Sequence, residues 1–507
     1  MNERLAEETL TNDNLHAACG GVKPLTARLE SWQKELCKRP ARLAALVREH
    51  GSPLHLHHVD PFLRNVRRLY EAADEVDVKL GVFLARKANK CLSFVKAARD
   101  AGFGVDTASE NELRQCLERG LPGERLILTA AIKGTAALSL CARHRVPATL
   151  DNFDEIEGLA SAARNAGTTA VGALRLSGFR HQGRKLFSRF GFDIDHAVAA
   201  VESQWRRPEI AERIRLEGLH FHLDGYDADQ RASALDQSLD LAEALRQRGH
   251  PVRFIDIGGG LPMSYLDDEA QWQAFWHHHR EALLGRQAPL TYRGQTLGLR
   301  AHEGRIEGKP KVYPFFQRPT GRQWLRRVLD APRTGTQHSL ATELRRLELE
   351  LRCEPGRSVL DGAGMTVARV AYRKLHHDGH WLIGLEMNST QCRTSSLDFM
   401  LDPLLLPTGL GRAKESSASS GSVSSGPGTG SEGFLVGAYC IENELLTSRR
   451  LRFPIGVEVG DLFVFPNTAG YFMHFLESRS HQFPLANNLV VGTGLDDIRL
   501  DEIHAES

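Results

Sequence analysis

The sequence lacks several features that mark familiar classes of protein. Its 507 residues include 64 Lys and Arg against 63 Asp and Glu, a net charge of +1, and no basic run is interleaved with aromatic residues. Clustered positive charge is what nucleic-acid-binding surfaces need, so this class is disfavoured. No apolar run approaches the length of a bilayer span, and the acidic N-terminus lacks the apolar stretch of a signal peptide. We therefore expect a cytoplasmic protein that binds neither nucleic acid nor membrane.

Cysteine pairs are also missing. The eight cysteines stand at positions 19, 37, 91, 116, 141, 353, 392 and 440, without a Cys-x-x-Cys pair. This scatter argues against a zinc site and against a disulfide framework. Three consecutive histidines at 277–279 would point to different faces of a helix, so we expect them at the surface and predict no metal site.

What the sequence does have is a regular alternation of short β-rich runs with helical patterns. The runs are 80–85, 104–106, 126–129, 148–150, 171–176, 218–223, 254–257 and 347–353. Eight strands alternating with helices indicate an α/β fold, a closed (β/α)8 TIM barrel. A doubly wound open sheet is the alternative.

The pattern also divides the chain into domains. We predict an N-terminal helical lead-in over 1–55, the barrel over 56–365, and a C-terminal β-rich domain over 366–507. In that last domain the predicted strands are 366–372, 381–387, 434–438, 455–459 and 462–465. A long insertion at 263–345 is a candidate lid or substrate wall. The Ser/Gly-rich stretch 413–433 is predicted to be disordered.

Chemically active residues follow the predicted strands. In a (β/α)8 barrel the active site lies where the strands end at their carboxyl side. The residues found there are Lys87, Asp106, Thr129, Asp151, Arg175, His222, the turn Gly258, Gly259 and Gly260, and the sequence Glu354-Pro-Gly-Arg357. Glycine turns with free backbone N–H groups bind phosphate. A lysine, a phosphate cradle and a carboxylate together indicate pyridoxal phosphate as cofactor.

Six ordered motifs carry a family resemblance. They are Arg86-Lys-Ala-Asn89, Gly104-Val-Asp-Thr-Ala-Ser109, Ser188-Arg-Phe-Gly191, Gly218-Leu-His-Phe-His222, Asp256-Ile-Gly-Gly-Gly260 and Glu354-Pro-Gly-Arg-Ser358. In this order the chain resembles the alanine-racemase-fold (fold-type III) decarboxylases of diaminopimelate, ornithine and arginine. The resemblance implies a barrel with a β-domain, an amino-acid substrate, and a homodimer with shared active sites.

The resemblance also implies a role for each residue. Lys87 would bond covalently to the cofactor aldehyde, His222 would stack on its ring, and Asp106 and Arg175 would line the pocket. Glu354 would keep the pyridine nitrogen protonated. The phosphate ligands would be Gly258, Gly259, Gly260, Gly356, Arg357 and Tyr471. Cys440 would handle the proton after carbon dioxide leaves, reaching in from the partner subunit.

Each of these residues also has a purely structural interpretation. Asp106 is equally suited to cap the next helix. Taken alone, Arg175 is more typical of a buried ion pair, His222 of a hydrogen-bonded core histidine, and Cys440 of a small buried apolar residue. The functional interpretation is preferred because all of the residues occur together.

Glu354 distinguishes two reactions. A carboxylate beside the pyridine nitrogen stabilises its charged form, which suits decarboxylation. Racemases of the same fold characteristically have an arginine there, so a racemase is the less favoured alternative. A non-catalytic cofactor-binding regulator is disfavoured because the lysine, the glutamate and the cysteine are all present.

The substrate has to be inferred from departures from the family pattern. Family members have an acidic residue after the catalytic cysteine, whereas this chain has Ile441, with Glu442 one place later, and Gly225 replaces the usual serine. A free distal ammonium would lack its partner there. We therefore hypothesise a diamino acid whose distal amine is already acylated, for example by citrate as in carboxylate siderophore pathways. Arg393, Arg449 and the basic insertion would then meet the carboxylates. Free diaminopimelate, ornithine or arginine is the alternative.

Overall fold

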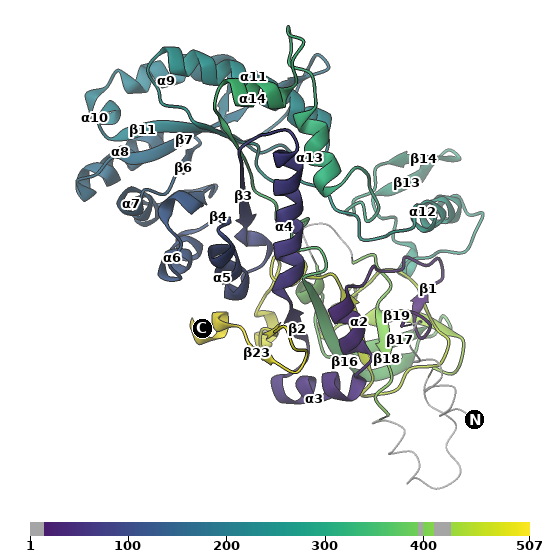
Figure 1. Cartoon of the computed structure of the whole chain (residues 1–507). Helices are drawn as coiled ribbons and strands as arrows, with labels where there is room; N and C mark the ends of the chain where they lie inside the picture. The colour runs from purple at the N-terminus through teal and green to yellow at the C-terminus, as the bar shows by residue number, and fades with distance from the viewer. Residues whose placement is uncertain (1–14, 394–398, 410–426, 507) are drawn as a thin grey trace, which may run out of the picture. The chain divides into compact units, whose positions relative to one another are not determined.

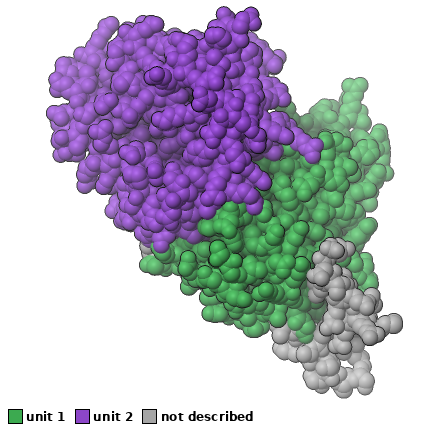
Figure 2. Space-filling model, viewed as in Figure 1, with its two compact units in different colours: residues 1–61, 263–317, 360–507 green, residues 62–262, 318–359 purple. Residues whose placement is uncertain are grey.

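The chain forms two compact units in the computed structural model, which describes residues 15–393, 399–409 and 427–506 (Figures 1 and 2). Unit 1 comprises residues 1–61, 263–317 and 360–507. Unit 2 comprises residues 62–262 and 318–359. Among the described residues, no helix is both long enough and apolar enough to cross a membrane.

Unit 2 is a closed barrel of parallel strands, as predicted. Its strands pair in the order β7-β11-β12-β15-β3-β4-β5-β6, and β6 pairs back with β7. Their bounds are β3 Leu80–Ala85, β4 Gly104–Thr107, β5 Leu126–Leu128, β6 Ala148–Leu150, β7 Ala170–Ser177, β11 Ile214–Phe221, β12 Phe254–Asp256 and β15 Glu350–Cys353. The short β10 (Phe192–Asp193) adds to the outside of β7. The closure β6–β7 excludes the open-sheet alternative.

Helices surround these strands (Figure 1). They include α4 Val59–Asp74, α5 Leu92–Ala101, α6 Glu110–Glu118, α7 Thr135–His144, α8 Phe153–Ala166, α9 Ala197–Trp205, α10 Pro208–Ala211 and α11 Ala228–Gln247. Helix α6 begins at Ser109, whose side chain accepts a hydrogen bond from the Glu112 N–H. Because Ser109 is the cap, the carboxylate of Asp106 has another role, described below.

The long insertion after β12 folds as two separate parts. Its first part, which belongs to unit 1, contains α12 (Glu269–Leu283) and the hairpin of β13 (Leu299–His302) and β14 (Arg305–Gly308). Its second part, in unit 2, contains α13 (Gly321–Leu329) and α14 (Leu340–Arg346). This part packs on α11, where Trp324 Nε1 donates to the carbonyl of Tyr226 at 2.8 Å.

Unit 1 is organised around a ten-stranded mixed sheet, in the order β1-β20-β19-β17-β16-β2-β22-β23, with β21 on β16 and β18 on β21. The strands are β1 Gly20–Gly21, β2 Leu54–His57, β16 Gly364–Leu375, β17 Trp381–Leu385, β18 Leu404–Leu406, β19 Ser431–Val436, β20 Leu451–Phe453, β21 Leu462–Pro466, β22 Asn487–Val491 and β23 Ile498–Leu500. Helices α2 (Ser31–Cys37) and α3 (Pro40–His50) contribute apolar residues to its core.

Three predictions for unit 1 were wrong. The predicted strand 455–459 is an irregular segment with turns at both ends, where Gly456 has a φ of +78°, and the preceding strand β20 ends at Phe453. The predicted disordered stretch 413–433 is wrong at its end, because β19 begins at Ser431; residues 413–426 lie outside the described residues, and there it stays a prediction. His279 is buried rather than exposed, with its ring stacked on Phe275.

A cluster of buried histidines lies in the core of unit 1. His55 Nδ1 lies 3.0 Å from Thr366 Oγ1, and the rings of His55 and His57 both contact His474. Burial lowers the pKa of His57 to about 4, although Asp501 acts in the opposite direction. The neutral imidazole is therefore the form that the folded protein stabilises.

This depressed pKa predicts a loss of stability in acid. Between pH 6.5 and 4 the unfolded chain binds a proton at His57 that the folded chain does not, so the free energy of unfolding falls as pH falls through this window. We expect a decrease of about 1 kcal/mol from this residue between pH 7.5 and 5.5, measured by urea denaturation. His57→Gln should remove this part of the pH dependence, and His377→Gln, at an exposed histidine, should not. An unchanged pH dependence in His57→Gln would contradict the assignment.

Candidate active site

Lys87 lies in the short turn η1 (Arg86–Ala88), immediately after β3. Its Nζ is 3.0 Å from Asp106 Oδ2, at the end of the neighbouring strand β4. The other oxygen of Asp106 accepts a hydrogen bond from Thr129 Oγ1 at 2.5 Å. The Lys87 side chain is 34% exposed, whereas that of Asp106 is fully buried. Asp106 thus holds the amine at the mouth of the barrel, where it remains accessible.

Arg175 approaches from β7. Its Nε lies 3.7 Å from Asp151 Oδ1, and its guanidinium lies over the Phe190 ring, 4.1 Å from the centroid. Asp151 Oδ1 also accepts the Gly191 N–H at 2.7 Å. The predicted motif at 188–191 therefore serves to hold Arg175 in place. Burial lowers the pKa of Arg175, and the surrounding carboxylates oppose this shift.

His222 follows β11 and is oriented by the glycine turn. Its Nδ1 accepts a hydrogen bond from the Gly259 N–H at 3.1 Å. Burial lowers the pKa of His222 well below its usual value, and the positive charge of Lys87 adds to this effect. A neutral imidazole with a fixed ring plane can stack on a cationic ring without charge repulsion.

The glycine turn uses more of its backbone N–H groups in internal hydrogen bonds than we predicted. Gly258 N–H donates to Asp256 Oδ1 at 2.9 Å, and Gly259 N–H donates to His222. Positive φ values of +67° at Gly258 and +80° at Gly260 explain why glycine stands at both positions. The prediction that this turn leaves its N–H groups free for phosphate is therefore wrong for Gly258 and Gly259.

Glu354 comes directly after β15 and is almost completely buried. Its Oε1 lies 3.2 Å from His220 Nε2, without the angles of a hydrogen bond, and both side chains are enclosed next to Asp256. Burial, reinforced by the charge of Asp106, raises the pKa of Glu354 to about 8. Burial also raises the pKa of Asp256 well above its usual value and lowers that of His220 to about 3.

The turn that carries Glu354 is attached to its neighbours on both sides. Its N–H donates to the Gly258 carbonyl at 2.9 Å, and the Pro355 carbonyl accepts the Ala85 N–H at 3.1 Å. Gly356 is buried in this turn, and Arg357 is half-buried. The ends of β15, β12 and β3 are therefore joined by backbone hydrogen bonds.

These residues fit pyridoxal phosphate. In the part of the chain that the structure describes, Glu354 Oε1 is a buried acceptor without a hydrogen-bond donor, which a pyridinium N–H would provide. An accessible amine, a neutral imidazole and a buried guanidinium lie at the ends of the surrounding strands. Lys87 and Glu354 would hold the aldehyde and pyridine ends of the cofactor, respectively.

The side chains of His220, Asp256 and Glu354 are also of the types that bind a divalent cation, and their ligand atoms lie within 4.8 Å of one another. All three side chains are buried in the barrel interior, and the raised pKa values favour protons on the carboxyl groups. We therefore interpret the cluster as interacting, protonated acidic side chains and not as a metal site.

Two predicted site residues belong to unit 1. Cys440 is exposed, and its Sγ lies 3.3 Å from His481 Nε2. His481 Nδ1 lies 3.2 Å from Ser480 Oγ, and its ring stacks on Tyr439. Tyr471 has a positive φ of 72°, which is uncommon for a non-glycine residue. His481 was not predicted, because it lies 41 residues from Cys440 and no sequence motif marks it.

The predicted substrate residues also lie in unit 1. Glu442 is exposed, and Arg393 Nη2 donates to the Leu445 carbonyl at 3.3 Å. Arg449, expected to meet substrate carboxylates, is instead buried in an ion pair with Asp402 at 2.6 Å. The expectation for Arg449 was wrong, because its charge is already paired with Asp402. The sequence alone does not reveal this pairing. Glu444, which was not singled out, is buried and accepts hydrogen bonds from Ser389.

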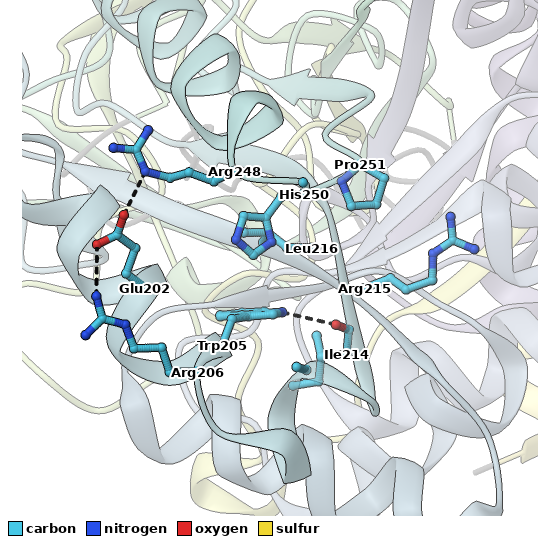
Figure 3. A pocket seen from close by; sticks show the side chains of 11 residues that line it. Glu202, Trp205, Arg206, Ile214, Arg215, Leu216, Arg248, His250 and Pro251 are labelled. Carbon is cyan, nitrogen blue, oxygen red and sulfur yellow. Dashed lines mark hydrogen bonds and ion pairs between the residues drawn. The ribbon is translucent and has the colours of Figure 1, made fainter.

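A surface pocket of about 500 Å³ lies elsewhere on unit 2 (Figure 3). It is lined at the amino-terminal start of β11, around Ile214, whereas His222 follows the opposite end of that strand. Trp205 Nε1 donates to the Ile214 carbonyl, and Arg248 pairs with Glu202. Glu202 thus pairs with Arg248 and Arg206 within the pocket, and none of the predicted site residues lines it.

Comparisons with known proteins identify the family of this domain. Residues 63–297 match the family described as pyridoxal-dependent decarboxylase, pyridoxal binding domain. The chain is 32% identical to the uncharacterized protein y4yA of Sinorhizobium fredii, over 86% of this chain and 87% of that protein. It is 25% identical to the diaminopimelate decarboxylase of Zymomonas mobilis, over 46% of this chain and only 58% of that enzyme.

Solved structures show the same fold. Diaminopimelate decarboxylase from M. jannaschii in complex with L-lysine has a TM-score of 0.63 at 16% identity, covering 90% of this chain and 91% of that one. Lysine decarboxylase from Selenomonas ruminantium has a TM-score of 0.62 at 16% identity, covering 93% and 98%. The matched pyridoxal-binding domain contains Lys87, Arg175, His222 and the glycine turn, so the chain belongs to the fold-type III family of pyridoxal phosphate-dependent decarboxylases.

Proposed function

We propose that this protein removes the α-carboxylate of an amino acid with the help of pyridoxal phosphate. The observation that carries the proposal is the buried Oε1 of Glu354, which accepts no hydrogen bond from the described residues, in the same barrel mouth as the accessible amine of Lys87. Pyridoxal phosphate, when bound, supplies a ring that accepts the electron pair left when the carboxylate departs as carbon dioxide.

Lys87 and Asp106 prepare the covalent attachment. The carboxylate of Asp106, at 3.0 Å, accepts a hydrogen bond from the amine and so holds it in one place. Thr129 fixes the second oxygen of Asp106, so the carboxylate keeps its orientation. When substrate replaces Lys87, Asp106 remains to orient the released amine. In this proposal Asp106 is a positioning residue for Lys87.

Glu354 determines the reaction type. Its pKa of about 8 means that an isolated carboxylate is disfavoured at this position, so it gains most from a neighbouring cation. A protonated pyridine nitrogen is such a cation, and Glu354 would hold the proton there during the reaction. This arrangement favours decarboxylation over the racemase alternative, in which an arginine would stand at this position.

Cys440 and His481 would return a proton to the α-carbon. The Cys440 S–H gives its proton to the carbon that has lost carbon dioxide, and the thiolate is then reprotonated through His481 Nε2, which is 3.3 Å away. Solvent supplies the net proton consumed. By resemblance to the family, we propose that Cys440 acts across a homodimer interface.

For the substrate, we propose a diamino acid with an acylated distal amine. Ile441 is exposed and apolar at the position where the family has an acid, and Glu444 is already occupied by Ser389. Of the described acidic residues that follow Ile441 closely in the sequence, Glu442 would then be the one left for a free ammonium. Arg393 remains as a cation for substrate carboxylates, whereas Arg449 is excluded by its pairing with Asp402. Free diaminopimelate, ornithine or arginine is the competing substrate class.

The role of Glu354 is tested with Glu354→Gln, which keeps the size of the side chain but cannot carry the negative charge. We expect kcat for carbon dioxide release to fall by about 100-fold while the cofactor remains bound, because the electrostatic stabilisation of the ring proton is lost. Glu350→Gln, at the start of the same strand, is the matched control and should retain wild-type kcat. Treatment with EDTA should have no effect. Wild-type kcat in Glu354→Gln would contradict the proposal.

The substrate class is tested by comparing kcat/KM for citryl-ornithine and citryl-diaminopropionate with that for free diaminopimelate, ornithine and arginine. An unpaired ammonium in the site costs a few kcal/mol, so we expect the acylated compounds to be preferred by about 100-fold. Preference for a free diamino acid would refute the acylated substrate but leave the decarboxylase assignment intact.

The pairing of Cys440 with His481 is tested by alkylation with iodoacetamide. Seven of the eight cysteines are buried, so the native protein should react at Cys440. His481→Phe keeps a ring for stacking on Tyr439 and Phe483 but removes the basic nitrogen. We expect the alkylation rate at pH 7 to fall about five-fold or more, because the nitrogen that would accept the thiol proton during the reaction is lost. His377→Phe is the control, and an unchanged rate in His481→Phe would exclude the pairing.

A further inference from the structure

Arg231 is a buried cation beside the candidate active site. It lies in the first turns of α11, and its side chain is fully enclosed. Its Nη2 donates to the carbonyls of Leu223, Gly225 and Gly259 at 2.8, 2.9 and 3.2 Å. Its hydrogen-bond acceptors in the described part of the chain are thus backbone carbonyls, and its Nε and Nη1 have no hydrogen-bond partner there.

Burying a guanidinium that has no carboxylate as a hydrogen-bond partner is unfavourable for the free energy of folding. Burial lowers the pKa of Arg231 to about 10, with only partial compensation from Asp227 and Asp224. A charge taken out of water without a paired countercharge is strongly disfavoured, unless an anion arrives to neutralise it. The protein retains the charge at a point where two glycine-containing turns meet, which indicates that an anion binds nearby.

Arg231 also determines which way these turns face. Because a trans peptide directs its C=O and N–H to opposite sides, each carbonyl held by Arg231 turns the N–H of the same peptide away from it. The Gly259 carbonyl belongs to the same peptide as the Gly260 N–H, and the Gly225 carbonyl to that of Tyr226. A Cβ at Gly260 would overlap Arg231 Nη2, so the backbone approaches the guanidinium closely.

We propose that Arg231 supplies a positive charge near the cofactor phosphate, in addition to that of Arg357, and holds the backbone that binds the phosphate. The inference rests on the proposed function, since the anion is the phosphate monoester of pyridoxal phosphate. It accounts for two observations that the glycine turn alone leaves open. The N–H groups of Gly258 and Gly259 are used internally, and Gly225 stands where the family has a hydroxyl group. The amino-terminal end of α11 adds a favourable dipole.

The experiment compares two ligands that differ only in the phosphate. Dissociation constants of pyridoxal phosphate and pyridoxal are measured by absorbance on cofactor-stripped full-length protein. Arg231→Met should raise the dissociation constant for pyridoxal phosphate by about 100-fold, because the positive charge and the anchor of both glycine-containing turns are lost, and that for pyridoxal by no more than about three-fold. Arg231→Lys keeps the charge but not the fork geometry and should give about a ten-fold effect on pyridoxal phosphate.

Arg248→Met is the matched control, because Arg248 ends the same helix but is exposed and pairs with Glu202. It should bind both ligands as the wild type does. Equal losses for the two ligands, or wild-type affinity in Arg231→Met, would overturn the inference. If Arg231→Met does not fold, Arg231→Lys decides the question in the same assay. If the wild type itself binds no pyridoxal phosphate, the proposed function fails instead.

Discussion

The enclosed carboxyl group of Glu354 is the constraint on which the proposed chemistry of this barrel depends. It lies among His220, Asp256 and Asp106, in a position where two carboxylates cannot both be charged at low cost. A protein gains nothing in stability from such a cluster, so the arrangement points to a ligand that brings a positive charge. The hydrogen bonds joining the ends of β3, β12 and β15 keep this cluster and Lys87 together.

Much of unit 2 follows from the sequence because local and tertiary requirements agree there. Strands β3 and β6 begin and end at the predicted residues, since short apolar runs between helical patterns have few alternatives in a closed parallel barrel. The order of residues at the strand ends follows from the same topology. In unit 1 the predicted strand 455–459 fails, because apolar residues occur there without extended backbone, and Gly456 allows the turn instead.

Contacts that depend on orientation are not visible in the sequence. The glycines at 258 and 259 are where the motif requires them, but which N–H groups remain available depends on Asp256 and His222. Arg449 has the charge expected of a substrate ligand, yet Asp402 neutralises it. Arg231 is the opposite case: the sequence did not single it out, because a helical arginine near an acidic turn resembles a surface residue. Only its burial and its three carbonyl partners distinguish it.

The two units carry different parts of the proposed chemistry. The residues that would hold the cofactor and stabilise charge on it are mainly in unit 2, whereas Cys440 with His481 and the residues around Ile441 are in unit 1. The main departures from the family pattern, apart from Gly225, also lie in unit 1. Substitutions there can change which side chain of the substrate is accepted without disturbing Lys87 or Glu354. The barrel therefore determines the type of reaction, and the sheet unit is where the choice of amino acid has to be sought.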